Sequence, residues 1–458
     1  MIIKQAKFIS MKNKVFFLAL FAITFFLHRY HFLNSDEGVV LANAWGLFNG
    51  KELYSDMFDF VAPASSYTVF WLWKIFGPHY FVAKTFAILV LFFSATGIYK
   101  ISRLFAQNKY SILAPLIFIL SSALGPLINH NVFNLFFLIW CIYFILKGLS
   151  NNSPNDFIIS GLLGGISLLF LQHKGLVLLF SIVTFLFFLF IKKRNREILE
   201  NVFYFLICSL LPILILIIIW PINTLYHNLI IFPLFHYYEG DKPPPGLLIL
   251  FLSVLALLTV VFRNEKNRNI WLILYVQFFL LLSTIPLADY YHILLILFPI
   301  YALLPLMFSK IRSKYTPFGK HLLYAIIFCI LLISIVPTAI NLFVLQKPNY
   351  NDLISFIEQN CQESQYLYAG PFIPGLYFET KKINPTPFSY LITKQHTKEQ
   401  FKQAHDYLSK IRPGCAVLNY EIVEKFNYDK NNPVDNFIEN NYKQIGEFGN
   451  CIIYIDTK

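Results

Sequence analysis

Long runs of apolar residues alternate with short polar segments through the first 345 residues of this 458-residue chain. Each run holds about 17 to 25 residues, which is the length that an α-helix needs to cross the hydrocarbon core of a bilayer. The pattern predicts a polytopic α-helical membrane protein with about 11 transmembrane helices. The predicted spans are 15–33, 80–99, 111–128, 132–147, 157–172, 175–191, 201–220, 246–262, 270–287, 290–308 and 321–345. The first span is long and lacks a small-residue cleavage site, so we expect a retained helix and not a signal peptide.

The segment 34–79, between the first two spans, follows a different pattern. It contains two shorter and largely apolar stretches, 37–48 and 65–76, each with tryptophan. Such stretches are typical of helices that lie in the membrane interface, with their indole rings at the level of the lipid headgroups. The tryptophans concerned are Trp45, Trp71 and Trp73.

The hydrophobic pattern changes again at residue 346. Helical periodicity appears at 352–360 and 398–411, and short strand-like runs appear at 366–368, 416–418 and 451–455. About 110 residues are enough for a small domain with its own core. We therefore expect a transmembrane domain over 1–345 and a small α/β domain over 346–458.

Composition supports the assignment to membranes and orients the bundle. The chain is 57% hydrophobic and only 14% charged, whereas soluble domains carry roughly 25% charged residues. Of its 37 Lys and Arg residues, 19 fall at the N-terminus and in the loops that share its face, and six fall on the opposite face. The positive-inside rule then predicts a cytoplasmic N-terminus, an extracytoplasmic C-terminal domain and a location in the cytoplasmic (inner) membrane.

The net charge of +12 does not indicate nucleic-acid binding. From residue 346 onward the chain has 12 basic and 13 acidic residues, so the tail is nearly neutral. The excess charge belongs to the cytoplasmic loops, where it reflects topology. In the tail, Cys361, Cys415 and Cys451 allow one disulfide and one free thiol in an oxidising compartment.

Polar and ionisable residues collect at the outer ends of the predicted helices. The acidic pair Asp36-Glu37 follows the first span, where a carboxylate has lost hydration and becomes a functional candidate. The outer loops converge on one face of the membrane, so we predict a single cavity open to the outside. The candidate catalytic residues are Asp36 and Glu37. The candidate substrate-binding residues are Asp56, Asp59, Lys84, His130, His173, Lys174, Glu239, Tyr291 and His292.

These residue types suit the transfer of a group from a lipid donor. A carboxylate can accept the proton of an attacking hydroxyl or amine. A Lys or His near the interface can neutralise a phosphate leaving group, because low dielectric strengthens ion pairing. Together they are compatible with glycosyl transfer from a polyprenyl-phosphate sugar.

Several features follow one another along the chain: Asp36-Glu37, Tyr54-x-Asp56-x-Phe58-Asp59 followed by Pro63, Lys174-Gly175, Tyr291-His292-x-Leu294-Leu295-x-x-x-Pro299, and the α/β tail. Their order resembles the GT-C superfamily of lipid-dependent glycosyltransferases, close to its protein O-mannosyltransferase and aminoarabinose transferase branch. The resemblance extends over nearly the whole chain. It implies an inverting transferase that moves a sugar to an envelope lipid, glycan or protein acceptor, with the acidic residue of the first loop as base or acceptor-orienting group.

Simpler interpretations stand beside these. Asp36 could be the N-cap of a helix over 37–48, and Asp56 and Asp59 could lie in turns of a solvated loop. Lys84 and Lys174 could be interfacial residues whose ammonium groups reach the headgroups. We expect no cofactor, although Asp56 and Asp59 leave a divalent metal open. The rival functions are a transporter or flippase of a lipid-linked glycan, and a glycan polymerase or ligase.

Overall fold

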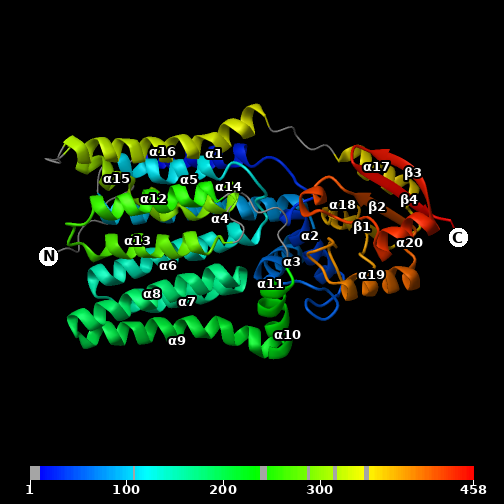
Figure 1. Cartoon of the computed structure of the whole chain (residues 1–458), viewed down its shortest axis with the longest axis horizontal. Helices are drawn as coiled ribbons and strands as arrows, with labels where there is room; N and C mark the ends of the chain where they lie inside the picture. Colours follow the sequence, from blue (N-terminus) through cyan, green and yellow to red (C-terminus); the bar gives the residue numbers. More distant parts are fainter. Residues whose placement is uncertain are drawn as a thin grey trace.

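The chain forms a helical bundle with a small mixed domain at one end (Figure 1). The computed structural model describes residues 11–106, 109–237, 245–285, 289–312, 317–344 and 350–457. Every predicted span contains a helix. The bundle helices are α1 Met11–Leu27, α4 Tyr80–Phe105, η1 Lys109–Ile112 with α5 Leu113–Ser121, α6 His130–Asn151, α7 Pro154–Phe170, α8 Gln172–Lys193, α9 Arg196–Ile219, α12 Gly246–Val261, α13 Arg268–Leu282, α14 Tyr290–Ile296 with α15 Phe298–Arg312, and α16 Pro317–Phe343.

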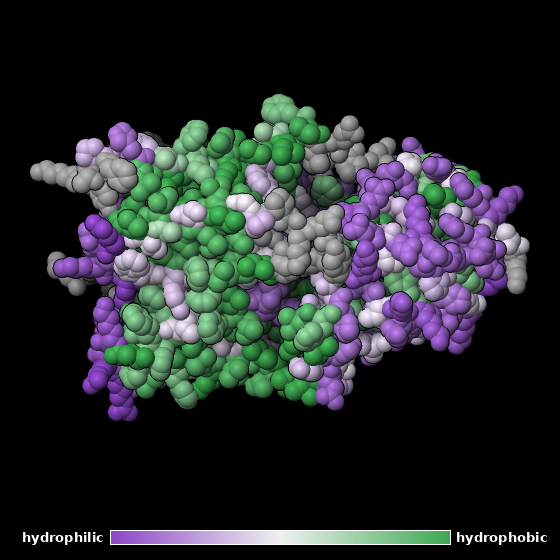
Figure 2. Space-filling model, in the orientation of Figure 1, coloured by the Kyte–Doolittle hydropathy of each residue, from purple (hydrophilic) through white to green (hydrophobic). Residues whose placement is uncertain are grey.

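The described helices differ in whether they can cross a membrane. Five of them, α4, α6, α8, α9 and α16, are long and apolar enough. Helices α14 and α15 meet at a bend of 54° and would form a sixth span together. The other apolar helices of the described bundle have 10–17 residues. The protein is therefore a multi-pass membrane protein by length and composition, and the number of eleven crossings stays a prediction. Figure 2 shows the apolar surface of this bundle on one face, between two polar ends.

Two predicted spans are wrong at their outer ends. The span 15–33 stops being helical after Leu27, and the span 111–128 stops after Ser121. In both places the backbone bonds to distant groups: the carbonyl of Tyr30 accepts from Lys84, and the N–H groups of Leu127 and Ile128 donate to Glu37. Apolar composition continues through these segments, so hydropathy alone could not mark where the helices end.

The outer segment forms α2 (Asp36–Phe48) and α3 (Ala64–Phe76) as predicted. However, the two helices lie between the bundle and the C-terminal domain (Figure 1), and two of their three indoles are covered by protein. Trp45 Nε1 donates to the carbonyl of Lys382 at 3.0 Å, and Trp73 stacks on Phe378 with ring centroids 4.4 Å apart. These two indoles therefore pack against the C-terminal domain, and their place at the headgroup level stays a prediction. Only Trp71 is exposed, at 59%.

A short bent segment follows α9. It consists of α10 (Ile222–Tyr226), a π-helical turn (His227–Ile231) and α11 (Phe232–Phe235). Phe232 is buried against Phe58 of the outer loop, with ring centroids 4.8 Å apart. The segment thus packs beneath the first outer loop and helps to hold it on the bundle.

The C-terminal domain is a four-stranded sheet with helices, as the sequence predicts. The sheet order is β1-β2-β4-β3, with β1 and β2 parallel and the other neighbours antiparallel. Strand β3 escaped prediction because its polar sequence lacks a clean apolar alternation. The elements are α17 Asn351–Asn360, β1 Leu367–Pro371, α18 Gly375–Glu379, α19 Lys398–Ile411, β2 Cys415–Asn419, η3 Val423–Phe426, α20 Pro433–Asn441, β3 Tyr442–Phe448 and β4 Cys451–Asp456.

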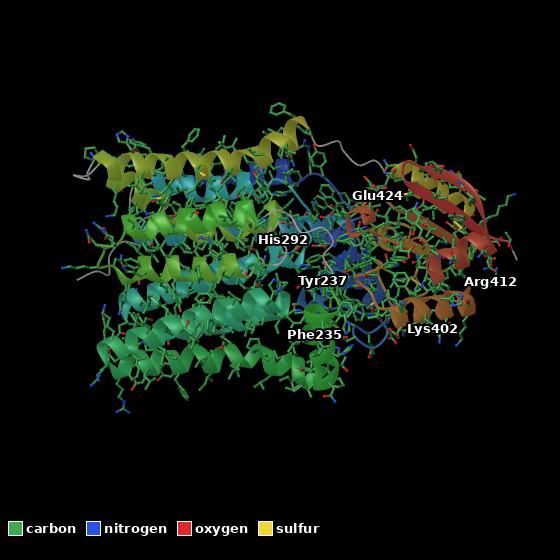
Figure 3. All side chains as sticks on the ribbon, viewed as in Figure 1. Phe235, Tyr237, His292, Lys402, Arg412 and Glu424 are labelled. Carbon is green, nitrogen blue, oxygen red and sulfur yellow. A yellow bond between two sulfur atoms is a disulfide. The ribbon has the colours of Figure 1, made fainter. Side chains whose placement is uncertain are left out.

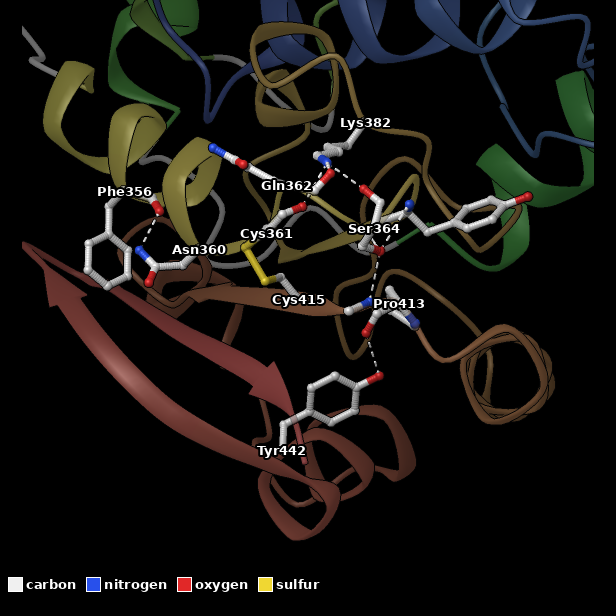
Figure 4. The surroundings of a disulfide bond; sticks show 11 residues. Phe356, Asn360, Cys361, Gln362, Ser364, Lys382, Pro413, Cys415 and Tyr442 are labelled. Atoms are coloured by element: carbon white, nitrogen blue, oxygen red, sulfur yellow. Dashed lines mark hydrogen bonds between the residues drawn. A yellow bond between two sulfur atoms is a disulfide. The ribbon is translucent and has the colours of Figure 1, made fainter. Parts of the chain in front are cut away.

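A disulfide joins the C-terminal end of α17 to the first residue of β2 (Figure 4). It links Cys361 to Cys415, which are 54 residues apart in sequence, and leaves Cys451 buried as a free thiol. Beside it, Lys382 Nζ donates to the carbonyls of Cys361 and Ser364. The disulfide therefore fixes the helix to the sheet, and the hydrogen bonds of Lys382 hold its segment beside them.

Replacing both Cys361 and Cys415 by serine is expected to destabilise the C-terminal domain by about 2–4 kcal/mol, because the unfolded chain regains the freedom of a long loop. Limited proteolysis of the purified protein measures this as faster cleavage within the tail. Cys329→Ser, at a half-buried free cysteine of α16, is the control. Equal cleavage of both variants would contradict a stabilising role for the disulfide.

Candidate active site

Glu37 is the buried anchor of the site. Its carboxylate is fully shielded from solvent and accepts hydrogen bonds from Tyr80 at 2.6 Å, Lys84 at 3.1 Å, and the backbone N–H groups of Leu127 and Ile128 at 3.1 and 3.3 Å. Burial alone would raise the pKa of Glu37, but the Lys84 charge and these hydrogen bonds outweigh it and lower that pKa. Glu37 is therefore a fixed anion that ties α2, α4 and the loop before α6 together.

Asp36 is placed very differently, although it is the adjacent residue. Neighbouring side chains on a helix point about 100° apart, so one faces the bundle and the other faces outward. The Asp36 side chain is 42% exposed, and Oδ2 accepts a hydrogen bond from Asn129 Nδ2 at 2.8 Å. The N-cap of α2 is Ser35, whose side chain accepts from the N–H of Glu37. Interpreting Asp36 as the cap was therefore wrong.

A chain of hydrogen bonds links Asp36 to Lys174. Asn129 donates to Asp36, and Asn129 Oδ1 accepts from Asn131 Nδ2 at 3.1 Å and from the N–H of Asn131 at 2.6 Å. Asn131 Oδ1 in turn accepts from Lys174 Nζ at 2.7 Å. Asn129 is the N-cap of α6 and Asn131 lies in its first turn, so the start of one helix holds an acid and a cation at a fixed separation.

Lys174 is a buried cation without a carboxylate of its own. Its side chain is 3% exposed, and among the ion pairs of the described residues none includes it. Lys84 differs, because Glu37 neutralises it. The hydrogen-bond partner of this ammonium is a neutral amide, and the Asp289 carboxylate acts on it from beyond ion-pair distance. An anionic ligand would therefore complete its charge.

Asp289 and His292 form a second acid–base pair at the same end of the bundle. Asp289 caps α14, and its Oδ1 lies 2.8 Å from the His292 N–H nitrogen and 2.8 Å from His292 Nδ1. This pairing orients the imidazole and leaves Nε2 available. Lys174 and His130 are within electrostatic range of this pair. Figure 3 shows His292 at the junction of the bundle with the C-terminal domain.

Tyr291 supports the loop that carries the site. Its hydroxyl donates to the carbonyl of Pro126 at 3.0 Å. Its ring lies against Gly125, where the backbone has a φ of +97° and an added Cβ would come within 2.6 Å of the ring. Because the next residues donate to Glu37, Tyr291 holds the Glu37 pocket in shape.

The C-terminal domain contributes to the site through Tyr390. Burial raises the pKa of Tyr390 well above its ordinary value, and Tyr237, Asp59 and Asp36 raise it further by their charges. Tyr390 therefore lies within electrostatic range of Asp36 and Asp59, while its ring packs against Phe372 and His396. Figure 3 shows Tyr237 at the same junction as His292.

The structure brings most of the predicted residues together, but not all. Asp36, Glu37, Asp59, Lys84, His130, Lys174, Tyr291 and His292 share this end of the bundle, and His173 lies exposed in the first turn of α8 beside them. Asp56 is exposed at the tip of the outer loop, where it accepts from the N–H of Glu52. Glu239 lies outside the described residues. Within the described chain, no group of three or more His, Cys, Asp or Glu side chains suits a metal ion.

Besides Asp289, which orients His292, four supporting residues were not among the predicted site residues. Asn129 and Asn131 flank His130 and form the link described above, Tyr80 bonds to Glu37, and Tyr390 comes from the tail. The two asparagines could have been found, because an amide at a helix start caps it. Nothing local marks Tyr390, since only the docking of the C-terminal domain places it there.

Asp59 makes the stability of the fold depend on pH. Burial raises the pKa of Asp59 from 3.8 to about 7, although hydrogen bonds from the Val61 N–H and from Asn43 act to lower it. Because the folded value exceeds the unfolded one, ionisation of Asp59 opposes folding. The fold is expected to lose stability as pH rises from 3.8 to about 7, with no further loss from this group above that pH.

Thermal unfolding of the wild type and of Asp59→Asn over this pH range measures the effect. The asparagine variant has no carboxyl to ionise at position 59. Its unfolding temperature is therefore expected to rise relative to that of the wild type as pH increases. A difference between the two that does not change with pH would contradict the expectation.

Comparison with known proteins agrees with this architecture. A family model described as dolichyl-phosphate-mannose-protein mannosyltransferase matches residues 61–220. Crystal structures of ArnT from Cupriavidus metallidurans, one in the apo state and one bound to undecaprenyl phosphate, match with TM-scores of 0.61 and 0.63. Both are 11% identical to this chain, cover 96% and 97% of it, and are themselves covered over 97% and 98% of their lengths. No curated protein matches the chain significantly.

These findings show which class of protein the chain resembles. The chain shares one fold with ArnT over nearly its whole length. The family match begins at residue 61, beyond Asp36 and Glu37, and includes the helices that carry Lys84, His130 and Lys174. The resemblance to the GT-C superfamily of lipid-dependent glycosyltransferases is thereby confirmed.

Proposed function

We propose that the protein transfers a sugar from a polyprenyl-phosphate donor to an acceptor of the cell envelope, at the membrane face that carries the C-terminal domain. The observation that carries this proposal is the hydrogen-bonded chain from Asp36 through Asn129 and Asn131 to Lys174. It fixes an accessible carboxylate and a buried cation, which has no ion-pair partner among the described residues, relative to each other. A base and a phosphate-binding cation are the two groups that such a transfer needs.

In the proposed reaction, Asp36 accepts the proton of the acceptor hydroxyl or amine as that atom attacks C1 of the sugar. The bond between C1 and the phosphate oxygen breaks, and the polyprenyl phosphate leaves with the electron pair. Lys174 stabilises the negative charge that builds on the phosphate. A single displacement of this kind inverts the configuration at C1.

The remaining groups have supporting roles in this proposal. Glu37 and Lys84 neutralise each other, so we assign them to positioning, in place of a catalytic role for Glu37 and direct phosphate contact by Lys84. His292, oriented by Asp289, supplies a second contact to phosphate or sugar. Asp59, His130 and His173 remain candidates for sugar contacts near the acid. The exposed position of Asp56 leaves it without an assigned part.

The location of the site is also part of the proposal. Basic loops at the other end of the bundle favour a cytoplasmic N-terminus, and the Cys361–Cys415 disulfide favours an oxidising compartment for the tail. The C-terminal domain and the site would then lie outside the cytoplasmic (inner) membrane. Lipid, glycan and protein acceptors all suit a site open to this face.

The test is transfer from a defined donor. Purified protein in lipid discs is incubated with polyprenyl-phosphate sugars that carry a label on the sugar, together with extracted envelope lipids, glycans or proteins. We expect the label to move to an acceptor with release of polyprenyl phosphate. Movement of the intact donor across the membrane, with no covalent product for any sugar, would overturn the proposal and indicate a transporter.

A further inference from the structure

A large groove lies in the half of the bundle opposite the candidate active site. It has a volume of about 1490 Å³, which exceeds the roughly 300–1,000 Å³ of ordinary small-ligand sites. Helix α13 packs against both α8 and α12 and forms the floor between them. Lys192 lies 18 residues beyond Lys174 on α8, so the groove opens roughly 27 Å from the active-site cation.

The walls of the groove are apolar and aromatic. They include Phe185 and Phe188 of α8, Leu252 and Leu255 of α12, and Phe278 of α13. Phe188 is 61% exposed and Phe278 is 40% exposed, so these rings face the groove and the surrounding lipid. An elongated apolar slot within a membrane bundle suits hydrocarbon chains.

The mouth of the groove carries a concentration of positive charge. Four basic residues surround it, and the only carboxylate in its described lining, Glu265, is paired with Lys310. Among the described residues, none of the three lysines of this mouth forms an ion pair. The basic residues are Lys192, Lys193, Lys266 and Arg268.

One buried polar atom in the lining has no partner. Asn269 is 5% exposed, and its Nδ2 donates to the carbonyl of Leu146 and to Ser150 Oγ at 3.2 and 2.8 Å. Its Oδ1 accepts nothing within the described chain. A buried acceptor of this kind is costly unless a donor completes it. A headgroup hydroxyl of a lipid would supply that donor.

We propose that this groove is a binding site for an anionic glycerophospholipid. Its phosphate is held by Lys192, Lys193 and Lys266, its acyl chains lie along α12 and α13, and a headgroup hydroxyl donates to Asn269. Basic pockets between transmembrane helices are suited to anionic headgroups. A polyprenyl-phosphate donor is a poor occupant, because its phosphate must reach Lys174 at the other end of the bundle.

Native mass spectrometry of the purified protein with phosphatidylglycerol and phosphatidylcholine tests the proposal. The triple variant Lys192→Gln, Lys193→Gln, Lys266→Gln is expected to bind phosphatidylglycerol on the order of 100-fold more weakly than the wild type. The matched control carries the same change of charge at the same end of the bundle but outside the groove: Lys100→Gln, Arg103→Gln, Lys109→Gln. This control is expected to bind as the wild type does.

A second pair of variants tests the slot without changing charge. Ala256→Trp places an indole in the groove and is expected to release the lipid, whereas Leu257→Trp, one residue along α12 and outside the lining, is expected to retain it. An equal loss of phosphatidylglycerol binding in the two triple variants would overturn the proposal. So would binding of phosphatidylcholine as tight as that of phosphatidylglycerol, or displacement of phosphatidylglycerol by polyprenyl phosphate. Sugar transfer is assayed separately, so its failure would not be mistaken for loss of this site.

Discussion

Asp36→Asn is expected to lower the turnover number for sugar transfer by roughly 10²- to 10⁴-fold, the usual contribution of a general base. Asparagine keeps the shape of the side chain and still accepts the hydrogen bond from Asn129, so the loop and α6 should keep their positions. It cannot take a proton from the acceptor. Single-turnover assays with a labelled donor measure the rate, and a separate binding assay should show that donor affinity is retained.

Asp56→Asn is the matched control for this experiment. It makes the same chemical change in the same outer segment, but at an exposed loop tip where the carboxylate accepts only a local hydrogen bond from Glu52. Its turnover should equal that of the wild type. If Asp36→Asn also kept full turnover while remaining folded, Asp36 would not be the base and the proposed mechanism would fail.

Glu37→Gln is expected to destabilise the protein by about 3–5 kcal/mol, because it leaves the Lys84 ammonium buried and unpaired. Lys84 is 7% exposed, and its other bond goes to the backbone carbonyl of Tyr30. The same change weakens the bonds from Leu127 and Ile128, so the loop that precedes α6 should loosen. Heating the purified protein in detergent and measuring the folded fraction reports this loss as a lower transition temperature.

Two further variants show whether the loss comes from the broken ion pair. In Glu37→Gln with Lys84→Met, neither charge remains in the interior, so much of the stability should return. Glu200→Gln breaks the exposed pair with Arg196 on α9 and should have almost no effect. If the double variant were no more stable than Glu37→Gln alone, the ion pair would not explain the loss.

The fold was accessible from the sequence to the extent that it depends on hydropathy. Helices such as α4 and α9 could be predicted because a membrane-spanning backbone must satisfy its own hydrogen bonds and therefore becomes helical wherever it is apolar. The ends of α1 and α5 could not, because apolar residues continue beyond Leu27 and Ser121 while the backbone bonds to Lys84 and Glu37.

Part of the candidate site could likewise be predicted from the sequence, and part could not. Lys174 and His292 could be predicted to meet, because the outer ends of the helices gather at one face of a membrane. The structure does not bring Asp56 to that place, since the loop turns it toward solvent. It adds Tyr390, which reaches the site only through the docking of a domain more than 300 residues away in sequence.

The sequence by itself determined that this is a helical membrane protein with an α/β tail and with acids and cations at the ends of its helices. Only the tertiary structure decided what each of those groups does. Asp36 and Glu37 are adjacent and chemically alike, yet one is partly exposed and the other is fully buried against Lys84. The difference arises because burial and hydrogen bonding depend on contacts between distant segments, which no local pattern records.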